Sequence, residues 1–186
     1  MPYNRCMAIR PIVRLGHPAL RQTAQPVAPA QLAGSELQDL IDDLIETMHA
    51  ADGVGLAAPQ VGVELQLFVY LSCPESEEPV ERVLINPALV PERGDLVEDW
   101  EGCLSIPDLR GLVPRHLALR AHGLDRHGKV VDERVEGLEA RILQHEFDHL
   151  NGIVFLDRMR DLRSLAYTDE WADYLADEGE EGAPVG

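Results

Sequence analysis

The residues best suited to catalysis lie in one short run late in the chain, HEFDH at positions 145–149. Residues four apart on an α-helix lie one turn apart on the same face, so His145 and His149 can bind one metal ion between them. Glu146 is then free to act as general base on a metal-bound water. The plainer alternative is an amphipathic helix with two partly exposed histidines. Apolar residues cover the other directions of this helix, which favours the metal site because buried imidazoles need partners.

A catalytic metal site of this kind needs a third protein ligand. One peptidase motif requires a histidine at the position of Phe155, and another requires a later glutamate, for which only Glu170 is available, in unsuitable surroundings. Cys103 is the better candidate, since a Gly-containing turn can present its thiolate and a divalent ion binds thiolate strongly. The residues alone leave open that Cys103 is simply a small buried apolar side chain.

Two helices must position these groups. The histidines lie on a predicted helix over residues 138–150, which Asn151 and Gly152 end. An earlier amphipathic helix is predicted from Ser35 to about Gly53, because Ser35 and Gln38 have the spacing of a capping box. Short β-rich runs lie between the helices, at residues 65–71, 83–85, 96–100, 117–121 and 129–135. The sequence predicts an α+β fold: strand-rich antiparallel sheets packed around a central helix bearing H-E-x-x-H, with an N-terminal amphipathic helix.

Length and charge restrict the possible functions. The 186 residues, 45% of them apolar, are enough for one domain, so we expect a catalytic domain over residues 1–168 and an acidic, mobile C-terminal tail over residues 169–186. A net charge of −17 argues against general nucleic-acid binding, because phosphates would be repelled. No run approaches the ~20 apolar residues that a bilayer requires, and no presequence is visible. The expected location is the cytoplasm, with translation starting at Met1 or Met7.

Three segments together resemble the signature motifs of the peptide deformylases: GVGLAAPQ at 53–60, EGCLS at 101–105 and QHEFDHL at 144–150. The resemblance implies a metal-dependent hydrolase of protein biosynthesis, which removes the N-formyl group from the initiator N-formylmethionine of newly made polypeptides and releases formate. It also implies that Cys103, His145 and His149 hold one divalent ion. The native ion would be Fe²⁺, with Zn²⁺, Ni²⁺ or Co²⁺ possible in a purified sample.

The resemblance assigns roles to residues around the ion. A metal-bound hydroxide would attack the formyl carbon, with Glu146 as general base and then general acid. The Gln60 side-chain amide and the backbone N–H of Leu104 would stabilise the negative charge on the formyl oxygen. Val54 and Gly55 would offer backbone groups to an extended peptide. The methionine pocket would include Ile142.

Some assignments stay open. Glu101 is either an acceptor for the outer N–H of one ligand histidine or a surface acid, and Arg141 lies on the helix face next to the histidines, where core packing is the expected role. The expected partners are N-formylmethionyl nascent peptides near the ribosome, although the acidic C-terminal end lacks the basic helix by which some deformylases dock. The rival functions are a peptidase, disfavoured by Phe155, and a non-enzymatic binding module, disfavoured by the presence of both Glu146 and Gln60.

Overall fold

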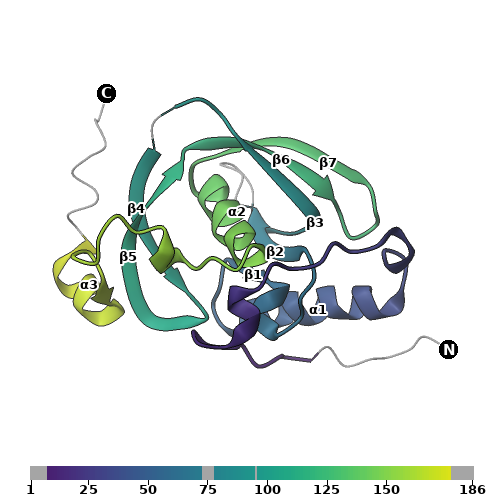
Figure 1. Ribbon diagram of the computed structural model, residues 1–186, viewed down its shortest axis with the longest axis horizontal. Coiled ribbons are helices and arrows are strands. Elements are labelled where there is room, and N and C mark those ends of the chain that lie inside the picture. The colour runs from purple at the N-terminus through teal and green to yellow at the C-terminus, as the bar shows by residue number, and fades with distance from the viewer. Residues whose placement is uncertain (1–7, 73–77, 95, 177–186) are drawn as a thin grey trace.

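A computed structural model describes residues 8–72, 78–94 and 96–176 of the chain. These residues form two antiparallel sheets, with strand orders β1-β2-β3-β6-β7 and β4-β5-β8, and three α-helices (Figure 1). The predicted α+β class with antiparallel sheets is therefore confirmed. The helices are α1 (Ser35–Ala50), α2 (Gly137–Leu150) and α3 (Thr168–Tyr174). The strands are β1 (Gly55–Ala57), β2 (Leu67–Ser72), β3 (Val80–Pro91), β4 (Leu96–Cys103), β5 (Ile106–His116), β6 (Ala118–Leu124), β7 (Val130–Glu136) and β8 (Ala166–Tyr167).

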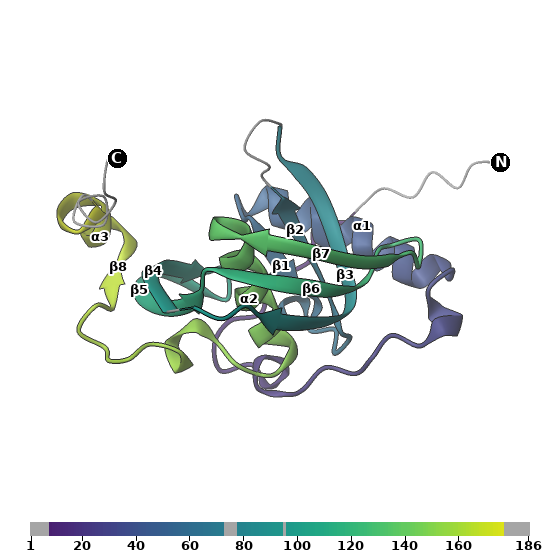
Figure 2. The same cartoon turned by 90° about the horizontal axis from the view of Figure 1, so that it is seen from above.

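Helix α2 lies between the two sheets. It packs against β1 and β2 of the five-stranded sheet and against β5 of the three-stranded sheet. Figure 1 shows α2 in the middle of the molecule, and Figure 2, turned by 90°, shows the large sheet alongside it. Residues that α2 carries can therefore meet residues from both sheets.

The apolar face of α1 packs on β1 and β2, and its fully buried residues include Ile41, Leu44 and Met48. The predicted capping box at its start is wrong. Helix α1 begins at Ser35 with Gly34 as the N-cap and no side-chain cap. The Gln38 side chain donates instead to the backbone carbonyls of Leu32 and Arg126, and so ties α1 to the β6–β7 turn. The sequence pattern located the helix correctly but assigned the wrong cap.

Helix α2 ends where the sequence predicts. Asn151 is its C-cap, and Gly152 follows with a φ of +71°. A Cβ at Gly152 would lie 2.7 Å from the backbone carbonyl carbon of Arg21, so both the left-handed conformation and the close approach of another backbone require glycine. This turn packs the end of the helix against the segment near the N-terminus.

Strands β1, β5 and β8 are not among the β-rich runs that the sequence predicts. Strand β5 contains Pro107, Gly111 and Pro114, which are turn signals, yet it pairs with β4 over nearly its whole length. On the other side of β5, β8 pairs only with Leu109 and Arg110, so the missing N–H of Pro114 falls outside that pairing. Strand β1 has three residues and is formed by pairing with β2 rather than by a local preference.

The C-terminal boundary expected at residue 169 falls inside α3, which spans residues 168 to 174. This helix packs on β5, next to the short strand β8 (Figure 2). Residues 177–186 lie outside the described residues, so the mobility expected for that end stays a prediction. None of the helices in the described part of the chain combines the length and the apolar composition that spanning a bilayer requires.

Candidate active site

Cys103, His145 and His149 meet between the sheets. The two histidines project from one face of α2, with ring centroids 5.0 Å apart. Cys103 ends β4 and pairs with Ile106 across a tight turn, which brings its sulfur to the helix. One potential ligand atom from each of the three residues lies within 4.8 Å of the other two, and Cys103 Sγ is 3.3 Å from His149 Nε2. Residues far apart in the sequence thus form one compact donor cluster.

Gln60 points its amide toward the same cluster. It lies in the 3₁₀ turn Ala58–Val61 directly after β1, and only 1% of the residue is exposed. Its Oε1 accepts a 2.8 Å hydrogen bond from Ala57 N–H, which fixes the orientation of the amide. Its Nε2 therefore faces the turn after β4 and donates to Cys103 Sγ at 3.6 Å and Ser105 Oγ at 3.3 Å. A neutral hydrogen-bond donor is thus held beside the sulfur.

Glu146 lies next to the cluster in a dry environment. The residue is 4% exposed, and its Oε2 has no hydrogen-bond partner among the described residues. Without a metal ion, burial raises the pKa of the Glu146 carboxyl from an ordinary 4.5 to about 7. A carboxyl with such a pKa can accept a proton from water near neutral pH and return it later.

His145 is oriented by Glu101. The two form a 2.9 Å hydrogen bond between His145 Nδ1 and Glu101 Oε2, which leaves the other ring nitrogen of His145 available as a ligand. Of the two roles expected for Glu101, the structure therefore shows the first, an acceptor for the outer ring nitrogen of a candidate ligand histidine. Burial alone would raise the pKa of Glu101, but hydrogen bonds from His145 and Arg115 hold it at about 2. The carboxylate stays ionised throughout the neutral range.

Two arginines hold Glu101 in turn. Arg115 binds both of its carboxylate oxygens, Nε to Oε1 at 2.9 Å and Nη2 to Oε2 at 3.0 Å. Arg141 Nη1 donates to Oε1 at 2.9 Å. Arg115 also contacts Asp148, which pairs with Arg158. Because every charge in this buried network has a partner, the carboxylate that orients His145 is held rigidly.

The core-packing role expected for Arg141 is wrong in its chemistry. Arg141 is buried, but it works as a polar clamp: besides Glu101 it donates to the carbonyls of Val97 and Val113, both at 2.8 Å. These carbonyls belong to β4 and β5, the hairpin that carries Cys103. Arg141 thus ties the histidine helix to the cysteine hairpin. The sequence contains one indication of this polar role, because a charged residue on a mostly buried helix needs a partner.

The two candidate ligand histidines differ electrostatically. Burial would lower the pKa of His145, but hydrogen bonds to Cys103 and Glu101 outweigh it and hold the pKa well above the usual value in the metal-free protein. Burial and the neighbouring His145 hold the pKa of His149 well below its usual value. A neutral imidazole is the form that binds a metal, so His149 is already in its ligating state.

The residues fit a divalent metal ion. One thiol and two imidazoles are the donor set expected for zinc or a soft first-row transition metal. The cluster is buried, and His145 has its outer nitrogen already paired, as ligand histidines usually do. Glu146 lies beside the cluster without being one of its three members, so it is available for proton transfer.

The cluster opens into a pocket of about 550 Å³, within the range of small-ligand sites. The predicted substrate residues Val54, Gly55 and Ile142 all line it, as does Leu104. Val54 is 48% exposed at the rim, and its carbonyl already accepts a hydrogen bond from Leu71 N–H. Strand β1 lies at one end of the strand order of the large sheet, next to β2. On its other side β1 pairs with no further strand of the described residues, and the Ala57 N–H there already donates to Gln60 Oε1.

A buried thiol and two imidazoles beside a carboxyl with a raised pKa, at the bottom of a pocket, define a candidate metallohydrolase. The polypeptide deformylase family profile matches residues 9–164. Peptide deformylase 1 of Nitrosomonas europaea is 47% identical over 166 residues, covering 87% of this chain and 93% of that protein. A peptide deformylase crystal structure from Legionella pneumophila is 40% identical with a TM-score of 0.75, covering 94% of this chain and 96% of that one.

A crystal structure of a class I type b peptide deformylase from Acinetobacter baumannii with bound Met-Ala-Ser is 34% identical, with a TM-score of 0.78 and coverage of 83% of this chain and 100% of that one. The chain therefore belongs to the peptide deformylase family, a family of metal-dependent hydrolases.

Proposed function

We propose that this chain removes the N-formyl group from the initiator N-formylmethionine of newly made polypeptides and releases formate. The observation that supports this most is the buried meeting of Cys103, His145 and His149 beside Glu146, in a chain of the peptide deformylase family. Cytoplasmic location and nascent peptides as substrates follow from this proposal. We do not expect docking to ribosomal RNA through α3, because its sequence TDEWADY contains three acids and no basic residue.

We propose Cys103, His145 and His149 as the metal ligands, with Fe²⁺ as the native ion and Zn²⁺, Ni²⁺ or Co²⁺ as substitutes. When bound, the ion supplies Lewis-acid activation of a water molecule and of the formyl oxygen. Glu101 fixes the ring of His145 through Nδ1, and Arg115 and Arg141 fix Glu101. The chain thus supplies a rigid donor set before substrate arrives.

Glu146 moves the protons in this proposal. Its carboxylate takes a proton from the attacking water, and the resulting carboxylic acid gives it to the leaving amine, so the residue ends in its starting state. Burial supports this role, since it raises the pKa of the carboxyl to about 7 in the metal-free protein. Gly55 leaves room for the carboxyl: a Cβ at residue 55 would lie 2.8 Å from Glu146 Cδ.

Gln60 and Leu104 stabilise the charge that develops on the formyl oxygen. Gln60 Nε2 already donates to Cys103 Sγ, which supports its role, and Leu104 directly follows Cys103 in the turn, so its backbone N–H would lie close to the reacting group. The substrate would lie in the pocket with its first side chain near Ile142 and its backbone along β1 near Val54 and Gly55. The Acinetobacter baumannii relative binds Met-Ala-Ser, which supports a pocket for peptides that begin with methionine.

The direct test of this function compares three peptides. Purified enzyme loaded with Fe²⁺ under argon is incubated with formyl-Met-Ala-Ser, acetyl-Met-Ala-Ser and unmodified Met-Ala-Ser, and formate, acetate and free amine are measured. We expect formate from the first peptide and no cleavage of the others. Cleavage of an internal peptide bond would make the chain a peptidase, and no metal-dependent turnover of any peptide would refute the proposal.

Replacement of Gln60 tests the proposed oxyanion donor. Gln60→Ala is expected to lower kcat about 100-fold, because one such donor is typically worth ~3 kcal/mol in the transition state, while the metal content stays unchanged. Gln60→Glu keeps an oxygen that can accept from Ala57 N–H but removes the amide donor. It should lower kcat by a similar factor. Steady-state kinetics together with metal analysis measure both, and an unchanged kcat in Gln60→Ala would remove Gln60 from the mechanism.

Replacement of Arg141 tests the clamp between α2 and the cysteine hairpin. Arg141→Met is expected to speed metal release to a chelator about tenfold, because Glu101 loses one of its two arginines and the carbonyls of Val97 and Val113 lose a donor. The matched control is Arg126→Met, which removes a guanidinium that bridges Gln38 and Asp42 away from the site. Equal metal release rates in both variants would contradict the clamp.

A further inference from the structure

The C-terminal segment β8–α3, residues 166 to 174, reaches the candidate active site although it lies beyond residue 164, where the match to the family profile ends. Strand β8 pairs with β5, Ala166 opposite Arg110 and Tyr167 opposite Leu109. Thr168, the first residue of α3, lines the pocket together with Arg110 and Leu109. One side of the pocket is therefore built partly from a segment outside the matched region.

A tilted aromatic pair holds this segment against the sheet. Trp171 of α3 lies against Trp100 of β4, with ring centroids 6.1 Å apart and planes at 60°. The guanidinium of Arg110 on β5 lies 4.4 Å from the centroid of the Trp171 ring, a cation–π contact. Trp100 and Arg110 both line the pocket. Trp171 thus holds α3 against two residues of the pocket wall and also holds those residues in place.

The position of this wall matches the length of a short peptide. Trp100 lies three residues before Cys103 on β4, and a strand rises about 3.3 Å per residue, so the two are separated by about 10 Å. An extended peptide covers the same distance in about three residues. A substrate with its formyl group at the cluster and its chain leading out past Trp100 would bring its second and third residues to this wall.

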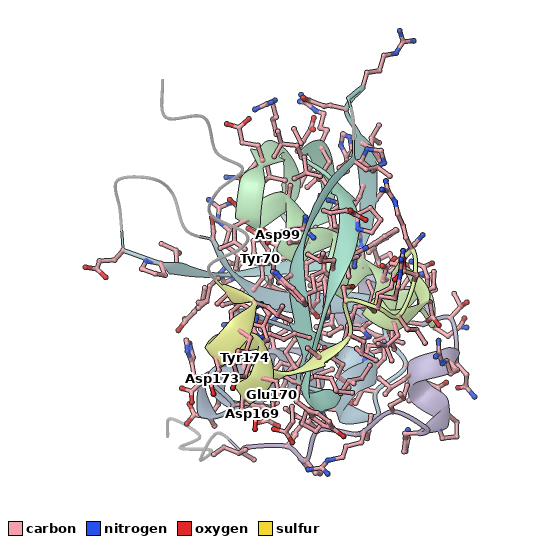
Figure 3. All side chains as sticks on the ribbon, turned by 90° about the vertical axis from the view of Figure 1, so that its left-hand side faces the viewer. Tyr70, Asp99, Asp169, Glu170, Asp173 and Tyr174 are labelled. Atoms are coloured by element: carbon pink, nitrogen blue, oxygen red, sulfur yellow. The ribbon has the colours of Figure 1, made fainter. Side chains whose placement is uncertain are left out.

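We propose that the β8–α3 segment, anchored by Trp171, forms an outer wall of the substrate pocket that contacts the second and third residues of a formyl peptide. This inference rests on the proposed deformylation, and it predicts that the enzyme distinguishes formylated tripeptides from formylmethionine derivatives with nothing after the methionine. Figure 3 shows this side of the molecule, where Asp169, Glu170, Asp173 and Tyr174 are labelled on α3. These four residues are not part of the pocket lining and have no role in the proposal.

The chain offers a direct optical test, because its two tryptophans are Trp100 and Trp171. Tryptophan emission of the metal-loaded enzyme is recorded during titration with Met-Ala-Ser and, separately, with methioninamide. We expect the tripeptide to change the emission and methioninamide to leave it unchanged at a concentration that inhibits turnover equally. The same change with both ligands, or no change at a saturating tripeptide concentration, would overturn the proposal whether or not turnover is measured.

Kinetics of matched variants separate a wall from a purely structural role. Trp171→Ala is expected to raise KM for formyl-Met-Ala-Ser about five- to tenfold, with kcat within twofold and KM for formylmethioninamide unchanged. Trp171→Phe should recover most of the loss, and Tyr174→Ala, which removes a side chain of α3 that is 72% exposed, should change neither substrate. Equal effects of Trp171→Ala on KM for both substrates would overturn the proposed outer wall. If the unmodified enzyme released no formate from any formyl peptide, the proposed deformylation would be refuted instead.

Discussion

Replacing Glu146 by Gln is expected to lower kcat for formyl-Met-Ala-Ser by about 10⁴-fold with the metal retained. The effect lies at the upper end for general acid–base catalysis because the same carboxyl is proposed to accept a proton from water and to donate one to the leaving amine. Glutamine fills the same space but can do neither. Rapid-quench turnover and metal analysis on the same sample measure both quantities.

The matched control is Glu139→Gln, one charge change on the same helix at a residue outside the site. Its kcat should match that of the unmodified enzyme. If Glu146→Gln loses the ion, then Glu146 is a ligand and its assigned role is wrong. If kcat falls less than tenfold with the ion in place, another group transfers the proton.

The same substitution has a consequence for stability in the metal-free protein. The pKa of the Glu146 carboxyl is about 7 in the folded protein, against an ordinary 4.5. Ionising it therefore costs more free energy in the folded protein than in the unfolded chain, which lowers the free energy of unfolding. The destabilisation by the ionised carboxylate is absent below pH 4.5 and grows between pH 4.5 and 7. Above pH 7 it reaches about 3 kcal/mol. Metal-free Glu146→Gln should therefore be more stable than the unmodified chain at pH 8 and gain little at pH 4.5. Urea unfolding at both pH values measures this difference.

The second large effect is expected from Gly55→Ala, which should lower kcat at least 100-fold without touching a ligand. A Cβ at residue 55 would lie 2.8 Å from Glu146 Cδ and 2.9 Å from Cγ, closer than real contacts allow. The carboxyl must therefore move, and a displacement of about 1 Å at a reacting group costs on the order of 10²-fold in rate. Steady-state kinetics with formyl-Met-Ala-Ser measure the loss.

A double variant shows whether Gly55→Ala acts through Glu146. In Glu146→Ala the atoms that the new Cβ would meet are gone, so adding Gly55→Ala should cause no further loss of unfolding free energy. In the unmodified background Gly55→Ala should destabilise measurably. Gly94→Ala, with no atom within 4 Å of the added Cβ, controls for replacing a glycine at all. Additive destabilisation in the double variant would show that Gly55 is needed for its backbone alone.

The sequence predicts those parts of the site that depend on local geometry. The spacing of His145 and His149 places both on one face of a helix, and the structure has that helix over Gly137–Leu150. Helix α1 is likewise evident from the spacing of its apolar residues. Cys103 is different: physical reasoning from the residues left its role open, and the resemblance of three motifs singled it out. The structure then brings its sulfur to the histidines.

The missed features are long-range. The hydrogen-bond partners of Arg141 lie 28 to 44 positions away in the sequence, and no local pattern around Arg141 indicates which residues they are. Strand β5 carries prolines typical of loops, and its pairing with β4 overrides that local preference. Trp100 and Trp171 lie 71 positions apart, a pairing that no helical or strand periodicity indicates. Such contacts depend on the complete fold, which a local pattern does not contain.

X-ray absorption at the metal K-edge of the loaded enzyme shows whether Cys103, His145 and His149 hold one metal ion. We expect one sulfur and two imidazoles bound to a single ion per chain, and loss of the sulfur signal in Cys103→Ala. A spectrum of the unmodified enzyme with no sulfur ligand, or one that Cys103→Ala leaves unchanged, would contradict this expectation.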